Sequence, residues 1–307
     1  MLKRRIILVI GLLLVAAIAL YCLDLASRQD DYFVERVGQL RDQRLVESSV
    51  AASRSDTLRL TSSSGLEINL RVRRPAATDR QLPVLVLIGG HQTGKDAVDL
   101  VGAPAGIAFA AIDYPYPGDT RIEGFTEAIR ALPKVQRTFI DTPPALSLLL
   151  EWLLQQPWVD PDRVELVGVS LGVPFAAAAG GVDERFARVW LIHGGAENLS
   201  WVKHAGRKAI ENETLRGSVA RIALFLVYGR SFEAGDWIPE IAPRPVIVIA
   251  ARDDDFVPPE AQEPFLEIAE SEHVELIWTE GLHIGPERTE ELQQLLDIVL
   301  ERIEPAA

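Results

Sequence analysis

The segment from Val164 to Ala179 constrains the fold more than any other part of the chain. An apolar run ends in Gly168-Val-Ser170-Leu-Gly172, and an apolar, alanine-rich stretch follows. This pattern is typical of a buried strand, a tight turn and the start of a helix, in which small flanking residues let the strand and the helix approach each other. Ser170 would then stand exposed at a sheet edge, beside the N–H groups of a helix N-terminus, with its hydroxyl free to attack a carbonyl carbon.

Apolar runs that predict strands alternate along the chain with segments that predict helices. Strands are expected at residues 57–61 and 66–72 on either side of a Ser-Ser-Ser-Gly turn, and at 83–88, 107–112, 164–169, 189–192, 245–250 and 274–278. Helices are expected at 144–155, 173–179, 259–269 and 287–303. The alternation predicts an α/β fold, with a mostly parallel sheet flanked by helices and an active site at the carboxyl edge of its strands.

The alternation lapses between residues 197 and 239, where the apolar spacing indicates helices rather than strands. In a chain that otherwise alternates, such a stretch is typical of an insertion between two strands. We therefore expect a small helical cap over the edge of the sheet, within a domain that spans residues 57–307.

The first 23 residues predict a membrane anchor. Lys3, Arg4 and Arg5 precede residues 6–23, which are almost wholly apolar. Eighteen helical residues span roughly 27 Å, about the thickness of the hydrocarbon layer. The positive-inside rule then keeps the N-terminus cytoplasmic and places the domain outside the cytoplasm, in the periplasm or the extracellular space. A cleaved signal peptide is the alternative. The polar residues 24–56 are expected to form a stalk.

Charge and cysteine content exclude some classes of protein. The 307 residues carry a formal net charge of −13, which argues against a nucleic-acid partner. Cys22 is the single cysteine, so the chain can form no intrachain disulfide.

Candidate partners for Ser170 follow two later strands. A serine hydroxyl is a weak nucleophile, which needs a base to take its proton and an acid to orient that base. Three consecutive aspartates, Asp253, Asp254 and Asp255, come after the strand expected at 245–250, and His283 follows the last strand between two glycines. The order Ser, Asp, His is that of α/β-hydrolases.

Residues 57–303 resemble the α/β-hydrolase superfamily, most closely its dienelactone-hydrolase and prolyl-oligopeptidase-like branches. Three motifs carry the resemblance: the Gly168–Gly172 turn, the Trp158-Val-Asp-Pro-Asp-Arg163 segment before it, and the Val257-Pro258 pair after the aspartates. The resemblance implies that Ser170 is the nucleophile, His283 the base and Asp254 the acid, although Asp253 and Asp255 stay open as alternatives. It also implies a serine hydrolase that acts on a small-molecule acyl substrate, by default an ester.

The oxyanion hole is expected to use the N–H of Leu171 and a second N–H from the loop after the strand at 83–88. The family usually has His-Gly in that loop, whereas this chain has Gly89-Gly90-His91-Gln92. The second donor is therefore open between His91 and Gln92. We expect His91, because aligning the glycine pair with the usual dipeptide places the donor just after Gly90.

Other functions are less consistent with the sequence. The glycine-rich stretch 89–94 is followed by Asp96 where a phosphate loop needs Ser or Thr, so nucleotide binding is rejected. No metal-binding motif is present, and we expect neither metal nor cofactor. Two alternatives remain: a peptidase of the prolyl-oligopeptidase type, for whose N-terminal propeller residues 24–56 leave no room, and a non-catalytic domain that binds a ligand.

Overall fold

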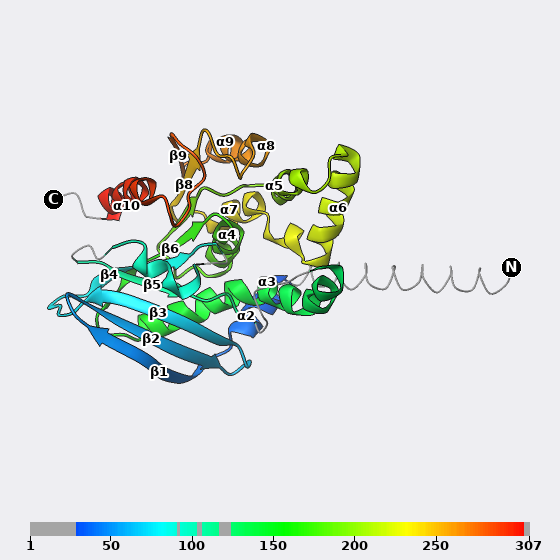
Figure 1. Cartoon of the computed structure of the whole chain (residues 1–307). Helices are drawn as coiled ribbons and strands as arrows, with labels where there is room; N and C mark the ends of the chain where they lie inside the picture. The colour runs from blue at the N-terminus through cyan, green and yellow to red at the C-terminus, as the bar shows by residue number, and fades with distance from the viewer. Residues whose placement is uncertain (1–28, 91–92, 103–105, 117–123, 304–307) are drawn as a thin grey trace, which may run out of the picture.

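A computed structural model describes residues 29–90, 93–102, 106–116 and 124–303. These residues form one nine-stranded sheet with helices on both faces (Figure 1). The strands are β1 (Leu40–Val50), β2 (Ser53–Ser62), β3 (Glu67–Pro75), β4 (Leu82–Ile88), β5 (Ala108–Ile112), β6 (Val159–Val169), β7 (Arg188–Ile192), β8 (Val246–Ala251) and β9 (Val274–Thr279). The main helices are α2 (Gln29–Val37), α3 (Gly124–Leu154), α4 (Gly172–Val182), α7 (Ala234–Ile241) and α10 (Thr289–Ile303).

The sheet is mixed, with the order β1-β2-β3-β5-β4-β6-β7-β8-β9. The first four strands in this order pair antiparallel, and from β5 to β9 every neighbouring pair is parallel. The parallel part agrees with the mostly parallel sheet expected from the sequence. Because the carboxyl ends of β4, β6, β7, β8 and β9 lie along one edge, the loops after these strands converge there.

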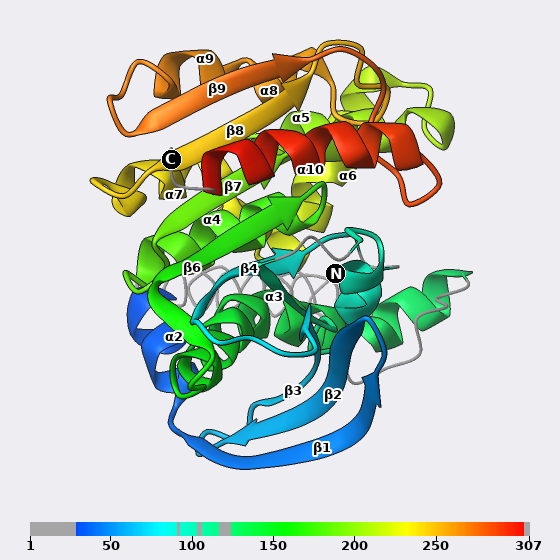
Figure 2. The ribbon, with the colours of Figure 1, turned by 90° about the vertical axis from the view of Figure 1, so that its left-hand side faces the viewer.

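The two faces of the sheet are covered very differently. Successive residues of β4 alternate between them: Val84, Val86 and Ile88 pack on one side, and Leu85 and Leu87 on the other. The first side is covered by α2, α3, α4 and α7. The second side, toward the viewer in Figure 2, is covered by α10 and by the six-residue 3-10 helix η1 (Gly94–Asp99).

One part of the expected fold class, the N-terminal transmembrane helix, is wrong. Among residues 29–303, as far as they are described, no helix is long and apolar enough to cross a membrane. The described fold therefore lacks the predicted N-terminal transmembrane helix. The stretch 6–23, for which that helix was expected, lies outside the described residues.

The segment expected to be a stalk belongs to the fold. Residues 40–50 form edge strand β1, which pairs antiparallel with β2 along its whole length. Before it, Phe33 of α2 is 1 % exposed and packs against Phe232 and Trp237. The Arg36 guanidinium also forms a bidentate ion pair with Asp141 of α3, at 2.7 Å for both contacts. These contacts tie residues 29–50 to the domain.

Helix α3 is much longer than the expected helix at 144–155. It starts at Gly124 and continues through Pro133, Pro143 and Pro144. Proline has no N–H to bond the carbonyl one turn earlier. In the middle of α3 two threonine hydroxyls also bond the carbonyl one turn earlier: Thr138 donates to Lys134 O and Thr142 to Thr138 O.

The stretch between β7 and β8 is helical, as the lapse in alternation indicated. It contains α5 (Asn198–Ala205), η2 (Gly206–Lys208), α6 (Glu213–Leu226), η3 (Gly229–Phe232) and α7. Its last helix packs on α4 and so belongs to the layer that covers the sheet. After β8 come two short helices, α8 (Pro259–Gln262) and α9 (Pro264–Ile268), at the positions of the helix expected at 259–269.

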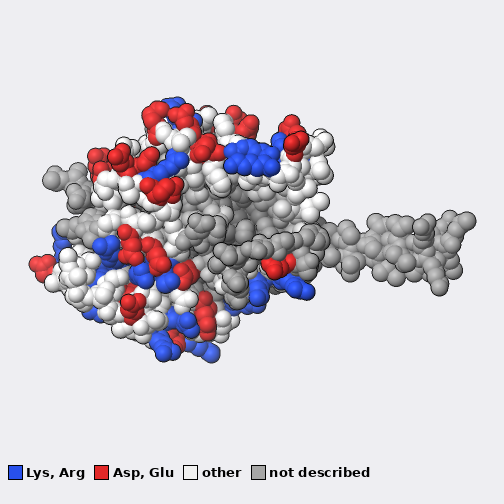
Figure 3. Space-filling model, in the orientation of Figure 1, with Lys and Arg blue, Asp and Glu red and all other residues white. Residues whose placement is uncertain are grey.

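Acidic and basic side chains are interspersed on the face shown in Figure 3, over the described part of the surface. This distribution, like the net charge of −13, offers no broad positive surface there for a polyanion.

Candidate active site

Ser170 occupies a strained turn between β6 and α4. Its φ is +52°, in the left-handed region that non-glycine residues rarely adopt. The two flanking glycines make the turn possible. A Cβ on Gly172 would lie 1.9 Å from the carbonyl oxygen of Ile88 in β4, and one on Gly168 would lie 2.5 Å from the Cβ of Ala176. The strain at Ser170 therefore persists because the strand and helix around it are fixed.

His283 and Asp254 lie beside this serine. Ser170 Oγ is 2.8 Å from His283 Nε2, and His283 Nδ1 lies 2.9 and 3.1 Å from the two carboxylate oxygens of Asp254. A carboxylate only accepts hydrogen bonds, so Nδ1 carries the proton and donates it to Asp254. Nε2 is then left with a lone pair that accepts the Ser170 hydroxyl. The three side chains form a hydrogen-bonded relay, an arrangement that is able to activate a serine as a nucleophile.

The Asp254 side chain is 1 % exposed and is held by the turn after β8. Its Oδ1 accepts hydrogen bonds from the N–H groups of Phe256 and Val257, at 2.9 and 2.7 Å. Burial favours a higher pKa for this carboxyl, but the hydrogen bonds from His283, Val257 and Phe256 outweigh it and hold the pKa below its ordinary value. Of the other two aspartates, Asp253 is exposed, and Asp255 Oδ1 accepts the backbone N–H of His283 at 3.4 Å.

The expected oxyanion donors are only partly within the described residues. Leu171 stands at the start of α4, where backbone N–H groups have no acceptor within the helix. His91 and its alternative Gln92 lie outside the described residues. The loop next to them is braced on both sides: the Tyr114 hydroxyl donates to Gly89 O at 2.7 Å, and the Thr93 hydroxyl donates to Gly90 O at 2.8 Å.

His193 also lies beside the relay, although it was not among the expected catalytic residues. It follows β7 with a φ of +51°, is 2 % exposed, and its ring centroid lies 6.1 Å from that of His283. The N–H of Ile284 donates to its Nδ1 at 3.1 Å, so its Nε2 carries the proton and donates to Thr279 Oγ1 at 3.3 Å. His193 thus positions the residue next to His283. Its place after a central strand was the only sequence signal for this role.

The same residues do not fit a metal site. His193, Asp254 and His283 each have a potential ligand atom, and these atoms all lie within 4.8 Å of one another. However, the Nδ1 lone pair of His193 accepts the Ile284 N–H, and its Nε2 bears the proton given to Thr279. His283 is engaged through both ring nitrogens with Ser170 and Asp254. Binding an ion would break these hydrogen bonds, so the donor set is that of a relay.

Burial of His193 makes folding sensitive to acid. Burial is the main cause that lowers the pKa of His193 from 6.5 to about 4. The nearby Asp254 favours a higher pKa, and His283 favours a lower one. Between these values the unfolded chain binds a proton that the folded chain does not, so the unfolding free energy falls as the pH drops from 6.5 to 4. The loss from this group is about 3 kcal/mol. In urea unfolding at pH 7 and 4.5, His193→Gln should lose less stability on acidification than the wild type; an equal loss would contradict the assignment.

Glu233 provides a control because its contribution to stability has the opposite pH dependence. Burial is the main cause that raises its pKa from 4.5 to about 7. The folded state holds a proton that the unfolded state lacks in this range, so its contribution to stability falls as the pH rises from 4.5 to 7. Glu233→Gln should therefore change the pH slope in the direction opposite to His193→Gln. The two groups change the unfolding free energy in opposite directions over this pH range, so their effects partly cancel in the wild type. Comparing the two variants separates their contributions.

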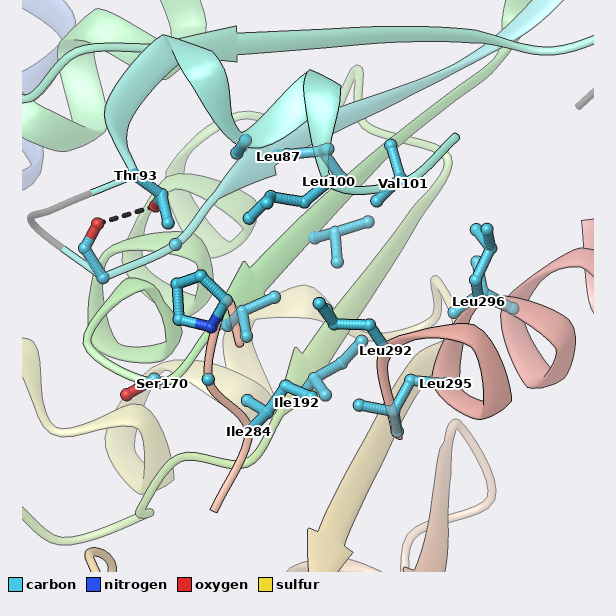
Figure 4. A pocket seen from close by; sticks show the side chains of 18 of the residues that line it. Leu87, Thr93, Leu100, Val101, Ser170, Ile192, Ile284, Leu292, Leu295 and Leu296 are labelled. Atoms are coloured by element: carbon cyan, nitrogen blue, oxygen red, sulfur yellow. Dashed lines mark hydrogen bonds between the residues drawn. The ribbon is translucent and has the colours of Figure 1, made fainter. Parts of the chain in front are cut away.

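An apolar cavity of about 340 Å³ opens beside Ser170 and His283 (Figure 4). Its floor is the face of the sheet that carries Leu87 and Ile192, and its opposite wall is α10. Phe256 lies at the same end as the relay; it is 46 % exposed, and its ring centroid is 4.9 Å from that of His283. The sequence predicted α10 as a helix, but not that it borders the site.

No protein-family model and no curated protein sequence matches this chain. Solved structures do match over most of its length. Acetyl xylan esterase 1 from Thermoanaerobacterium sp. JW/SL YS485 superposes with a TM-score of 0.63 at 16 % identity, covering 90 % of this chain and 92 % of that one. Glucuronoyl esterase from Solibacter usitatus gives 0.52 at 15 % identity, covering 89 % and 91 %. The α/β hydrolase GrgF from Penicillium sp. sh18 gives 0.56 at 16 % identity, covering 81 % and 97 %.

Proposed function

We propose that this chain, which has the α/β-hydrolase fold, is a serine hydrolase that cleaves a carboxylic ester through Ser170, His283 and Asp254. The observation that carries the proposal is the continuous hydrogen-bonded line from Ser170 Oγ through both nitrogens of His283 to a buried, charged Asp254. A serine without a catalytic role would not need a left-handed backbone and two neighbouring glycines that hold it at the end of a central strand.

In the proposed reaction, Ser170 Oγ attacks the ester carbonyl carbon while its proton passes to His283 Nε2. Asp254 stabilises the resulting imidazolium. The tetrahedral intermediate collapses as the C–O bond to the alcohol breaks, and His283 returns the proton to the departing alcohol oxygen. Water then attacks the acyl-enzyme with His283 again acting as base, which releases the acid and restores the Ser170 hydroxyl. The Leu171 N–H, at the start of α4, is the described candidate for stabilising the oxyanion.

Two further observations support an ester as the substrate. The solved structures that match this fold include proteins named as esterases, among them acetyl xylan and glucuronoyl esterases. The cavity beside Ser170 is apolar, which suits an uncharged acyl compound. We propose small-molecule esters as the substrate class.

A fluorophosphonate probe tests the nucleophile directly, because displacement of its fluoride by Ser170 Oγ leaves a stable phosphonate ester. We expect the wild-type protein to gain the mass of one phosphonate on the peptide that contains Ser170, and to hydrolyse p-nitrophenyl acetate and butyrate. Labelling with turnover of peptide p-nitroanilides but not esters would favour the peptidase alternative. A folded protein with neither labelling nor turnover would contradict the proposal and favour a non-catalytic binding domain.

A further inference from the structure

The cavity beside Ser170 lies on a face of the sheet that is thinly covered. The parallel connection from β4 to β5 usually carries an α-helix. Here the described part of this connection holds only the six-residue η1, whose Ala97 and Val98 pack on the sheet. Helix α10 covers the rest of this face but leaves a space between its own side chains and the strands. That space is continuous with the relay, since Ser170 and His283 are part of its lining.

The wall formed by α10 is apolar along one side of the helix. Leu292, Leu295, Leu296 and Val299 follow the i, i+3, i+4, i+7 spacing that puts side chains on one face, and all four line the cavity. Figure 4 shows Leu292 and Leu295 across the cavity from Leu87 and Leu100, with Leu296 at the far end of the view from Ser170. Among the described lining residues the polar side chains are Thr93, Ser170 and His283.

We infer that this cavity binds an aliphatic acyl chain of medium length, and that the substrates are esters of about eight- to twelve-carbon acids. The inference rests on the proposed function and specifies its substrate. Burying a sugar or a charged acyl group against these leucines would leave its polar atoms without hydrogen-bond partners, at a large cost in free energy. An aliphatic chain has no such atoms and gains from every methylene removed from water.

The volume sets the length of the chain. An engineered apolar cavity of about 150 Å³ in another protein binds benzene, with its six carbons. A cavity of about 340 Å³ is roughly twice as large, so it accommodates about a dozen carbons. An acetyl group would leave most of this space unfilled.

The chemistry assigns the cavity to the acyl group rather than to the alcohol. The alcohol must leave before water can attack, whereas the acyl group stays bound to Ser170 Oγ throughout this exchange. A cavity bounded by the sheet and α10 suits the part of the substrate that stays. The alcohol would leave on the side of His283 where the exposed Phe256 lies.

The test is a series of p-nitrophenyl esters from acetate to dodecanoate, in which the leaving group is constant and only the acyl chain varies. For the wild type we expect kcat/KM to rise by at least about 100-fold from acetate to octanoate or decanoate, since each buried methylene contributes up to about fourfold. Leu295→Trp, which fills the cavity, should lower the ratio of kcat/KM for decanoate to that for acetate by at least tenfold. Gln294→Trp places the same side chain on the exposed side of α10 and should leave the whole profile unchanged.

A profile that peaks at acetate, or an unchanged ratio in Leu295→Trp, would overturn the inference while leaving the proposed function intact. If no ester in the series is hydrolysed, the proposed function fails, and binding decides the inference on its own. In that case decanoate should bind Ser170→Ala by titration calorimetry, and Ser170→Ala with Leu295→Trp should bind it at least tenfold more weakly. Absence of decanoate binding to Ser170→Ala would overturn the inference.

Discussion

Replacing Ser170 with alanine is expected to lower kcat for p-nitrophenyl ester hydrolysis by about 10⁵-fold, with little change in stability. Removing the nucleophile of a serine hydrolase leaves only the catalysis that comes from oxyanion stabilisation and substrate binding. The substitution removes one oxygen. Alanine at position 170 has the same left-handed φ of +52° as serine, so the backbone strain is unchanged. The fold around the turn is fixed by Gly168, Gly172 and the Ser170 N–H, which donates to Ile192 O at 2.9 Å.

Kinetics and unfolding have to be measured on the same preparation. Chemical unfolding of Ser170→Ala should give a midpoint close to that of the wild type, so that the lost rate is assigned to chemistry. Ser218→Ala is a matched control, because the Ser218 hydroxyl donates to Thr214 O on the exposed side of α6, away from the relay. Its kcat should equal that of the wild type. Residual activity above a few per cent in Ser170→Ala would mean that another group attacks the ester.

The residues of the relay could be located from the sequence because each one follows a strongly apolar strand. The strand expected at 164–169 is the second half of β6, and those expected at 245–250 and 274–278 cover nearly all of β8 and β9. Their loops meet at one edge since the strands are parallel. Runs of buried Val, Ile and Leu make such strands easy to recognise. The resemblance also implied an α/β-hydrolase fold, and a solved structure named as an α/β hydrolase shares the fold of this chain.

Elements whose stability does not come from an apolar pattern were missed. Strand β1 is exposed along nearly its whole length, and it is held by the backbone ladder to β2, which the residue pattern of 40–50 does not reveal. Helix α3 passes through Pro143 and Pro144, which normally predict a helix boundary. The cavity was missed for a different reason: α10 has an ordinary amphipathic pattern, and only the three-dimensional packing shows that a cavity remains between part of its apolar face and the sheet.

Substituting asparagine for Asp254 should lower kcat by about 10³- to 10⁴-fold, although the two side chains have nearly the same shape. The turn after β8 decides which way the new amide lies. Oδ1 already accepts the N–H groups of Phe256 and Val257, so the amide oxygen must stay there and the NH₂ group takes the place of Oδ2, 2.9 Å from His283 Nδ1. The NH₂ group at 2.9 Å lies closer to Nδ1 than the remaining oxygen at 3.1 Å. Because two donors repel each other, we expect His283 to move its proton to Nε2. In that tautomer it cannot accept the proton of Ser170.

Asparagine at the two neighbouring positions separates Asp254 from the alternatives that the sequence left open. Asp253→Asn makes the same change of charge and shape on an exposed side chain, and should keep kcat within about twofold of the wild type. Asp255→Asn keeps an oxygen able to accept the 3.4 Å hydrogen bond from His283 N, so a change of a few-fold at most is expected. If Asp253→Asn or Asp255→Asn instead lost as much kcat as Asp254→Asn, bulk negative charge rather than the tautomer of His283 would be the cause.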